Sequence, residues 1–279
     1  MKIMNIKYYL PLIHSKKISI YPFFRLGGFG LGNMLFPFFR ALTACIRDGA
    51  NLLYPHHQQI QPRNFLRERT FDSLRNYSDD FEKFNWSYLT RIESFIIYQS
   101  RLWQNESQIG KSPNILFTGT KNYFFDLIDY REIIQNYIYF SYGVNKEIKK
   151  NNVAFHLRLG DFLINKQNLE SEKVLYALNY FTQQLLFKVE IYSDYNLDQI
   201  KRYLGVRSLP KNIKLVKSVS TMFDLINMSK SEYICGNPYS TFVEWSRFLS
   251  FCDQKSYSLV EKSLSDKISV SPLKWNNFL

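Results

Sequence analysis

The sequence predicts an α/β protein built from two parallel-sheet domains. In the second half of the chain, apolar runs alternate with helical stretches over short links, which is typical of a parallel sheet covered by helices. The first half opens with the same order around a glycine-rich turn. Hydrophobic residues make up 46% of the 279 residues, so the chain can build a sizeable core. We expect one domain over 1–145 and another over 146–279, divided at the polar stretch 142–152.

In the first half of the chain, secondary structure can be predicted with most detail before residue 56 and after residue 112. Residues 1–17 are interrupted by Lys, Asn, Pro and His and lack the features of a signal peptide. Residues 56–112 are polar, aromatic and irregular, with helical stretches near 79–85 and 89–103. The remaining elements that we expect are a strand over 18–25, a turn over 26–33, a helix over 34–49 ending at Gly49, strands over 50–55 and 114–119, and a helix over 123–140.

The second half alternates regularly between the two kinds of element. We expect strands over 153–158, 188–194, 212–217 and 232–236, and helices over 171–187, 196–204, 221–231 and 239–251. In such open parallel sheets, ligands bind beyond the carboxyl ends of the strands. Polar residues that follow these strands are therefore the first candidates for a functional site.

The net charge and the cysteine content indicate which partners and which kinds of stabilising site the protein can have. A net charge of +12 favours an anionic partner such as a nucleotide-sugar, a nucleic acid or an acidic membrane, although a solvated lysine-rich surface explains it equally well. The three cysteines are widely spaced and form no CxxC pair, which argues against a disulfide framework or zinc site and fits a reducing compartment. No stretch approaches the length of a membrane span, so we expect a cytoplasmic protein.

The first candidate segment is "GGFGLGN", from Gly27 to Asn33. Its four glycines, Gly28 among them, allow a sharp turn and a close approach of the backbone to a ligand. The following helix offers free N–H groups to an anion. A tight turn without a ligand is the alternative, because a lone glycine-rich loop is a weak signal.

The second candidate segment is "HLRLGD", at the end of the first strand of the second half. Arg158 provides a planar fork that matches phosphate oxygens. His156 can donate to a phosphate or a sugar, and Asp161 can accept from a hydroxyl or orient the arginine. The alternative is a structural salt bridge at a strand end.

Two further strand ends complete the set. Ser193 and Asp194 close the next strand, and "NPYSTF" opens the last helix with Ser240, Thr241 and Phe242. The hydroxyl and N–H groups of this last segment can hold a phosphate. An ordinary helix N-cap at Ser240 or Thr241 is the alternative.

In order, these segments resemble motifs of the bacterial α-1,2-fucosyltransferase family. That family shows a "GGLGNQ-F" loop, a "Q-S-KYF" segment, an "H-R-GD-Y" motif, an "SDD" strand end and an "NS-FSWWAA-L" helix. The corresponding stretches here read "GGFGLGNMLF", "FTGTKNYF", "HLRLGDF", "IYSDY" and "NPYSTFVEW", between Gly27 and Leu249. The resemblance implies a GT-B-like fold, with two Rossmann-type parallel-sheet domains facing a cleft. It also implies an inverting, metal-independent transfer of L-fucose from GDP-fucose to the 2-hydroxyl of a galactoside, with no cofactor beyond the donor.

The resemblance also implies a role for each candidate residue. The donor side would consist of Arg158 on the diphosphate, His156 and Asp161 in the same pocket, Ser193 and Asp194 near the nucleotide, and Ser240, Thr241 and Phe242 near the phosphates. Gly28 and Asn33 would face the sugar from the N-terminal, acceptor-side domain. We take Asp161 as the candidate general base. The sequence departs from the family pattern at Met34, Leu159, Tyr195 and Glu244.

Expected partners follow from the same resemblance. They are a GDP-sugar donor and a lipid-linked oligosaccharide acceptor of surface polysaccharide or O-antigen synthesis, with peripheral contact at the anionic inner membrane. The chain has no DxD triplet, so we expect no metal. A nucleic-acid partner is not expected, because no RNP motif, zinc finger or basic helix accompanies the positive charge. Three alternatives stay open: transfer of another sugar from a GDP donor, a non-catalytic sugar or nucleotide binder, and a nucleic-acid-binding protein.

Overall fold

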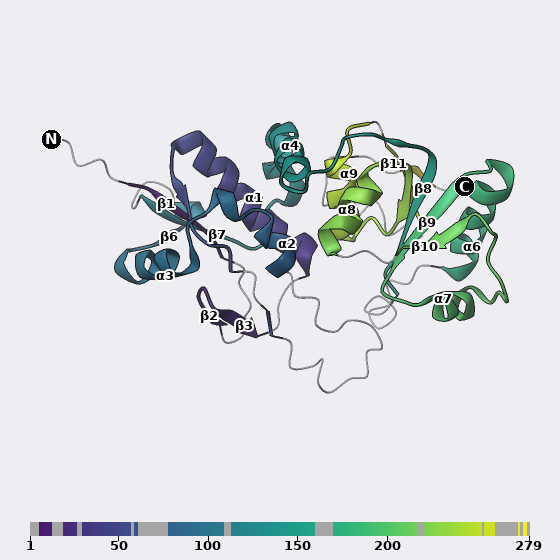
Figure 1. The fold of residues 1–279 in the computed structure, drawn as a ribbon, viewed down its shortest axis with the longest axis horizontal. Coiled ribbons are helices and arrows are strands. Elements are labelled where there is room, and N and C mark those ends of the chain that lie inside the picture. Colours follow the sequence, from purple (N-terminus) through teal and green to yellow (C-terminus); the bar gives the residue numbers. More distant parts are fainter. Residues whose placement is uncertain are drawn as a thin grey trace. The chain divides into compact units, whose positions relative to one another are not determined.

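The computed structural model divides the chain into two compact units, Met1–Ile134 and Gln135–Leu279 (Figure 1). Each unit contains its own parallel sheet. The α/β, GT-B-like class that the sequence predicts is thereby confirmed in its two parallel sheets. The structure describes residues 6–12, 19–26, 30–56, 59–60, 78–108, 113–159, 170–216, 220–252, 254–259, 273 and 276–277.

The sheet of the first unit has four parallel strands in the order β4-β1-β7-β6. These strands are β1 (Tyr8–Leu12), β4 (Asn51–Leu52), β6 (Gln104–Asn105) and β7 (Asn114–Thr118). A separate three-stranded sheet is formed by β2 (Ser19–Ile20), β3 (Phe24–Leu26) and β5 (Gln59–Ile60). The predicted single strand over 18–25 is instead the antiparallel pair β2 and β3 with a turn at 21–23, and the parallel sheet of this unit begins earlier, at Tyr8.

Pro11 explains why this strand is hard to find in the sequence. Proline has no N–H for a sheet ladder and normally argues against a central strand. Here β1 pairs with β4 only at Tyr8 and Tyr9, so Pro11 lies beyond that ladder. Pairing with β7 continues through Leu12 on the other side. Beyond Tyr9, the segment that follows β4 bonds this strand from the His56 N–H to the Pro11 carbonyl at 3.5 Å, a contact that needs no proline N–H.

Helix α1 (Leu31–Asp48) includes nearly all of the predicted helix over 34–49. It ends as predicted at Gly49, whose φ of 63° places it in the left-handed region that glycine adopts without strain. The helix is buried along most of its length, since aromatic side chains from elsewhere pack on it. The ring of Phe38, for example, stacks on that of Phe84 with centroids 5.3 Å apart.

Short helices make up much of the rest of the first unit, as far as the structure describes it. They are α2 (Ser78–Glu82), η2 (Asn85–Ser87), α3 (Arg91–Ser100), η3 (Glu106–Gln108), η4 (Tyr123–Asp126), η5 (Ile128–Tyr130) and α4 (Arg131–Ser141), which continues into the second unit. The predicted helix over 123–140 is thus two 3-10 turns followed by an α-helix. Thr90 begins α3 with a capping box to Glu93.

The sheet of the second unit has six parallel strands in the order β10-β9-β8-β11-β12-β13. They are β8 (Lys149–Leu157), β9 (Lys188–Ser193), β10 (Ile213–Leu215), β11 (Ser231–Gly236), β12 (Lys255–Ser258) and β13 (Asn276–Asn277). Counted along this unit, the order is 3-2-1-4-5-6, which is that of a Rossmann sheet. The strand order reverses between β8 and β11, so the carboxyl ends of these two neighbours form the topological switch point.

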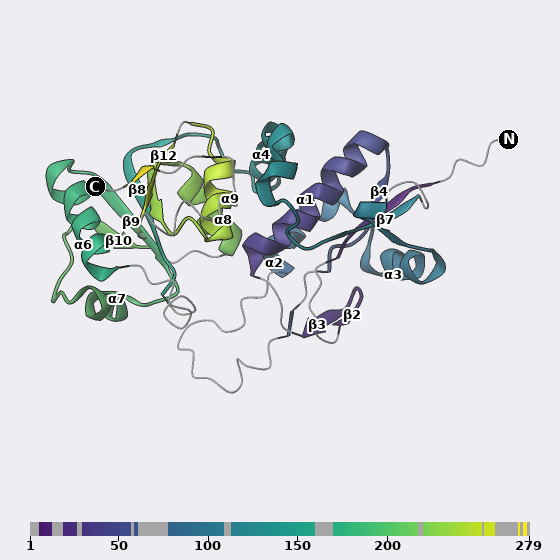
Figure 2. The same ribbon diagram turned by 180° about the vertical axis from the view of Figure 1, so that it is seen from behind.

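Helices cover both faces of this sheet (Figures 1 and 2). They are α6 (Ser171–Asn179), which continues as the π-helical turn η6 (Tyr180–Gln184), α7 (Leu197–Leu204), α8 (Thr221–Ser229) and α9 (Thr241–Leu249). Phe155 of β8 packs in one buried cluster with α6 and α7, and Ala154 packs in another with α8 and α9. Successive residues of a strand point to opposite faces, so one strand serves both layers. Within the described residues, no helix has the length and hydropathy needed to cross a membrane.

Candidate functional site

The candidate site lies at the switch point of the second unit. His156 is the penultimate residue of β8, and Arg158 follows the strand. On the neighbouring strand β11, Asn237 follows Gly236, and Ser240 then begins α9. The register pairs Cys235 with Phe155, so the two strand ends lie side by side. This is where an open parallel sheet binds its ligand.

The His156 side chain is packed into this corner. Its ring lies 5.2 Å from that of Phe242, at an interplanar angle of 33°. A Cβ built on Gly236 would lie 3.3 Å from a Val243 methyl carbon and 3.6 Å from the His156 Cβ, which leaves no spare room at the strand end. Burial, and then the nearby charge of Arg158, lower the pKa of His156 to about 3. The imidazole is therefore neutral at physiological pH.

Three buried polar atoms at this corner have no hydrogen-bond partner among the described residues: His156 Nδ1, Asn237 Nδ2 and Ser240 Oγ. The residues are 7%, 1% and 4% exposed. An unsatisfied buried polar group costs about 1–3 kcal/mol, so such atoms are uncommon in folded proteins. Their gathering at the switch point indicates that a polar ligand completes them.

The hydrogen bond made by the Asn237 side chain determines which of its atoms can bind a ligand. Its Oδ1 accepts from the Tyr239 N–H at 2.8 Å, which orients the amide and leaves Nδ2 as a donor. Ser240 stands at the N-cap position of α9 but makes no side-chain cap hydrogen bond. The simple capping alternative thus has no support at Ser240, whose hydroxyl is left for another group.

The remaining sequence-predicted residues of this unit lie around the same corner. Ser193 ends β9, beside β8, and Asp194 follows it; they hydrogen-bond the backbone of Leu157 and Leu159 respectively. Thr241 is the first residue of α9. Asp161 lies within 160–169, outside the described residues, so its proposed role stays a prediction.

The predicted residues of the first unit are described only in part. Gly28 lies within 27–29, outside the described residues. Asn33 is in the first turn of α1, and its buried Oδ1 has no hydrogen-bond partner in the described part of the chain. Its relation to the site of the second unit stays a prediction.

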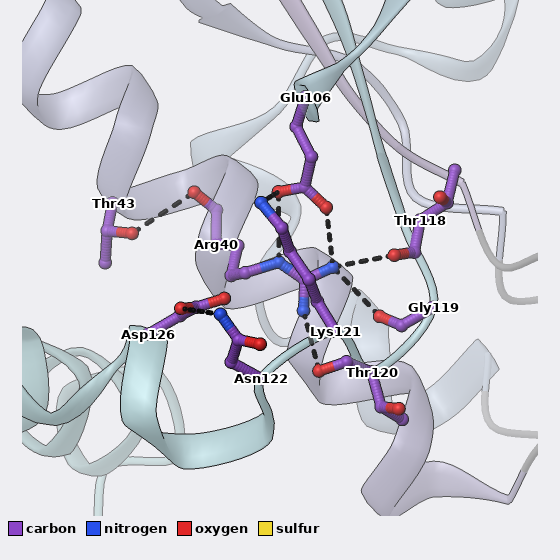
Figure 3. Close-up of polar contacts among 9 residues, drawn as sticks. All are labelled: Arg40, Thr43, Glu106, Thr118, Gly119, Thr120, Lys121, Asn122 and Asp126. Carbon is purple, nitrogen blue, oxygen red and sulfur yellow. Dashed lines mark hydrogen bonds and ion pairs between the residues drawn. The ribbon is translucent and has the colours of Figure 1, made fainter. Parts of the chain in front are cut away.

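The segment "FTGTKNYF" begins with the last two residues of β7 and is held by Arg40 (Figure 3). This arginine of α1 is 5% exposed and donates to the carbonyls of Thr118 at 2.8 Å, Gly119 at 2.9 Å and Thr120 at 3.3 Å. It also bonds both carboxylate oxygens of Glu106, at 3.0 and 3.2 Å. Arg40 thus fixes three successive peptide groups at the strand end of the first unit.

The positions that depart from the family pattern are occupied by structural side chains. Leu159 is 2% exposed and belongs to the core under α6 and α7, and Tyr195 packs against the same core. Met34 is fully buried in α1. Glu244 pairs with Arg247 inside α9 at 2.7 Å.

Asn237 is the functional candidate that the residue patterns did not single out. Its place before Pro238 is typical of a turn residue and gives no separate sign of a ligand contact. Only the burial of its amide and the bond to Tyr239 show that a donor is left over. Within the described residues, no group of three or more His, Cys, Asp or Glu side chains is placed to hold a metal.

The neutral His156 predicts a pH dependence of stability. The unfolded chain takes up a proton near pH 6.5, whereas the folded chain does so only near pH 3, so stability falls as the pH drops through this window. We expect a contribution of about 1.4 kcal/mol per pH unit, absent in His156→Gln. Urea unfolding of both proteins at several pH values between these limits measures it. Equal slopes for the two proteins would contradict a buried neutral imidazole.

Comparison with known proteins finds similarity in structure and none in sequence. No family model and no curated protein sequence matches the chain. Among solved structures, POFUT1 in complex with GDP aligns at 12% identity and a TM-score of 0.45, covering 91% of this chain and 98% of that one. NodZ α-1,6-fucosyltransferase soaked with GDP-fucose aligns at 12% and 0.40, covering 88% and 93%. A variant of Arabidopsis thaliana FUT1 in complex with GDP aligns at 11% and 0.43, covering 96% and 75%.

Proposed function

We propose that the chain is a glycosyltransferase that moves L-fucose from GDP-fucose to the 2-hydroxyl of a galactoside with inversion. The single observation that supports a polar ligand best is the group of unsatisfied buried atoms of His156, Asn237 and Ser240 at the switch point beside Arg158. The choice of GDP-fucose depends on the motif series from Gly27 to Leu249. In this proposal, residues 146–279 bind the donor and residues 1–145 serve the acceptor.

The proposed mechanism uses these groups on the leaving diphosphate. The bond between the sugar C1 and the β-phosphate oxygen breaks, and the acceptor 2-oxygen forms the new bond to C1. Negative charge that develops on the diphosphate is met by Arg158, by the donors of Asn237 and Ser240, and by the N-terminus of α9. The proton of the acceptor hydroxyl passes to a carboxylate base, for which Asp161 is the candidate.

His156 has a defined part in this scheme. Because its pKa lies far below neutrality, it brings no positive charge to the pocket. A neutral imidazole can still donate one hydrogen bond, through whichever nitrogen carries the proton. We therefore assign to His156 the role of orienting the ligand, and to Arg158 the role of stabilising the charge on the diphosphate.

The acceptor follows from the proposed family. A lipid-linked oligosaccharide of surface polysaccharide or O-antigen synthesis fits a basic chain that works beside an anionic inner membrane. A second candidate, transfer of a different sugar from a GDP donor, is favoured by Leu159. The family carries a second arginine there, and here the side chain is buried in the core. A donor screen against a panel of galactosides separates the two.

The proposal predicts selective binding of guanine nucleotides. GDP at about one hundred times its dissociation constant is expected to raise the free energy of unfolding by roughly 2.7 kcal/mol. UDP at the same concentration is expected to do far less. Thermal and urea unfolding with each nucleotide measure the difference, and equal stabilisation by UDP would contradict a GDP-sugar site.

Ser240→Ala provides a sharper test of the site. Because the Ser240 hydroxyl makes no cap bond, its loss is expected to change stability by less than about 0.5 kcal/mol. GDP binding should weaken roughly tenfold, since a hydrogen bond to a charged group is lost. The matched control is Ser220→Ala, because the Ser220 hydroxyl caps α8 by accepting from the Phe223 N–H at 3.3 Å. That control is expected to lose about 1 kcal/mol of stability and to bind GDP normally.

A further inference from the structure

The two residues at the end of β9 bond the backbone on either side of Arg158. The Ser193 hydroxyl donates to the Leu157 carbonyl at 2.6 Å, and the Asp194 carboxylate accepts from the Leu159 N–H at 2.9 Å. Leu157 and Ser193 are the last paired residues of β8 and β9. The side chains therefore hold the chain together just where the strand ladder stops.

The hydrogen-bonding capacity of Ser193 is already committed. A hydroxyl has one O–H to donate, and here it goes to the Leu157 carbonyl. The same oxygen accepts from the Tyr195 N–H at 3.0 Å. In this arrangement Ser193 has no donor left for a phosphate oxygen, so its role is in the backbone and not on the ligand.

The leucines beside Arg158 fix the same segment from within. Leu157 is fully buried and Leu159 is 2% exposed, both in the core under α6 and α7. Arg158 itself is half-buried. The Arg158 backbone is thus anchored on both sides by a buried side chain and a hydrogen bond.

We propose that Ser193 and Asp194 are positioning residues, which hold the Arg158 backbone so that the guanidinium meets the diphosphate in one geometry. The inference rests on the proposed function, because it takes Arg158 as the diphosphate ligand. A bidentate fork needs its carbon chain fixed to gain from both of its bonds. The carboxylate of Asp194 then acts through Leu159 and Arg158, without a contact to the nucleoside.

Binding of two probes tests this assignment. Asp194→Ala is expected to weaken GDP and inorganic pyrophosphate by the same factor, about tenfold, because both depend on Arg158. Asp194→Asn is expected to recover most of the loss, since its amide oxygen can still accept from the Leu159 N–H. Loss of GDP affinity with unchanged pyrophosphate affinity would show a direct nucleoside contact and overturn the proposal.

A double-mutant cycle with Arg158→Ala separates positioning from direct contact. If Asp194 acts through Arg158, Asp194→Ala adds little to the loss already caused by Arg158→Ala. Additive losses would overturn the positioning role. If Asp194→Ala does not fold, Ser193→Ala replaces it in the same cycle, with the same two outcomes. Unchanged affinity in Arg158→Ala alone would refute the proposed function, which is a different result.

The matched control is Asn212→Ala. The Asn212 amide donates to the carbonyls of Thr182 at 3.2 Å and Phe187 at 2.8 Å, so it ties two backbone segments of the same unit. Its removal is expected to lower the melting temperature and leave both affinities unchanged. A loss of affinity in this control equal to that in Asp194→Ala would show that general loosening explains both, and would overturn the positioning role.

Discussion

Arg158→Ala is expected to reduce turnover per folded molecule on the order of a hundredfold to a thousandfold. In the proposed mechanism, the negative charge that develops on the leaving diphosphate is met by this guanidinium and by neutral donors. The fold should survive, because Arg158 is half-buried and its neighbours Leu157 and Leu159 supply the packing. Turnover, GDP affinity and melting temperature are measured on the same preparation.

Arg158→Lys is expected to fail nearly as badly. An ammonium keeps the charge but cannot form two parallel bonds to phosphate oxygens. The exposed Arg202→Lys on α7 is the control and should behave as wild type. If Arg158 only formed a structural ion pair with Asp161, Arg158→Ala would lower the melting temperature, and the molecules that still fold would keep their catalytic turnover. Activity lost on chelation and restored by manganese would contradict the scheme as well.

The sequence predicted the second unit well because its signals are local. The four strands predicted there each contain a short apolar run, and helix α7 begins and ends with ordinary capping residues, Asn196 and Gly205. The site followed from one general rule, that ligands bind at the carboxyl ends of parallel strands. Strands β12 and β13 were not predicted, because Lys255–Ser258 and Asn276–Asn277 are too short and polar to stand out.

The first unit was harder because its stability comes from distant partners. Arg40 falls within an apolar helix, and nothing near it in the sequence can neutralise it. Its partners are Glu106 and the carbonyls of 118–120, more than sixty residues away. Local periodicity in the sequence carries no information about an ion pair between residues so far apart. The same limit applies to Asn237, whose importance shows only when its burial is known.

The second large effect is expected inside α9, at the ion pair between Glu244 and Arg247. The two side chains are 1% and 4% exposed, and the guanidinium bonds both carboxylate oxygens, at 2.7 and 2.9 Å. Arg247 Nε also donates to the Ser256 hydroxyl of β12 at 2.8 Å. Removing one partner leaves a buried charge without its counter-ion. Glu244→Met and Arg247→Met are each expected to lose about 3–5 kcal/mol of the free energy of unfolding.

The double variant distinguishes this cause from a general sensitivity of the helix. With both groups replaced by methionine, no uncompensated charge remains buried, so the double variant should be more stable than either single one. The control is an exposed i,i+3 pair, between Asp198 and Lys201 on α7, where Asp198 is 80% exposed. Asp198→Asn is expected to cost less than about 1 kcal/mol, because water already solvates both charges. Urea unfolding of the wild type and of these four variants gives the comparison. Single variants of α9 as stable as wild type would show that water reaches this pair and that α9 is held by its apolar face alone.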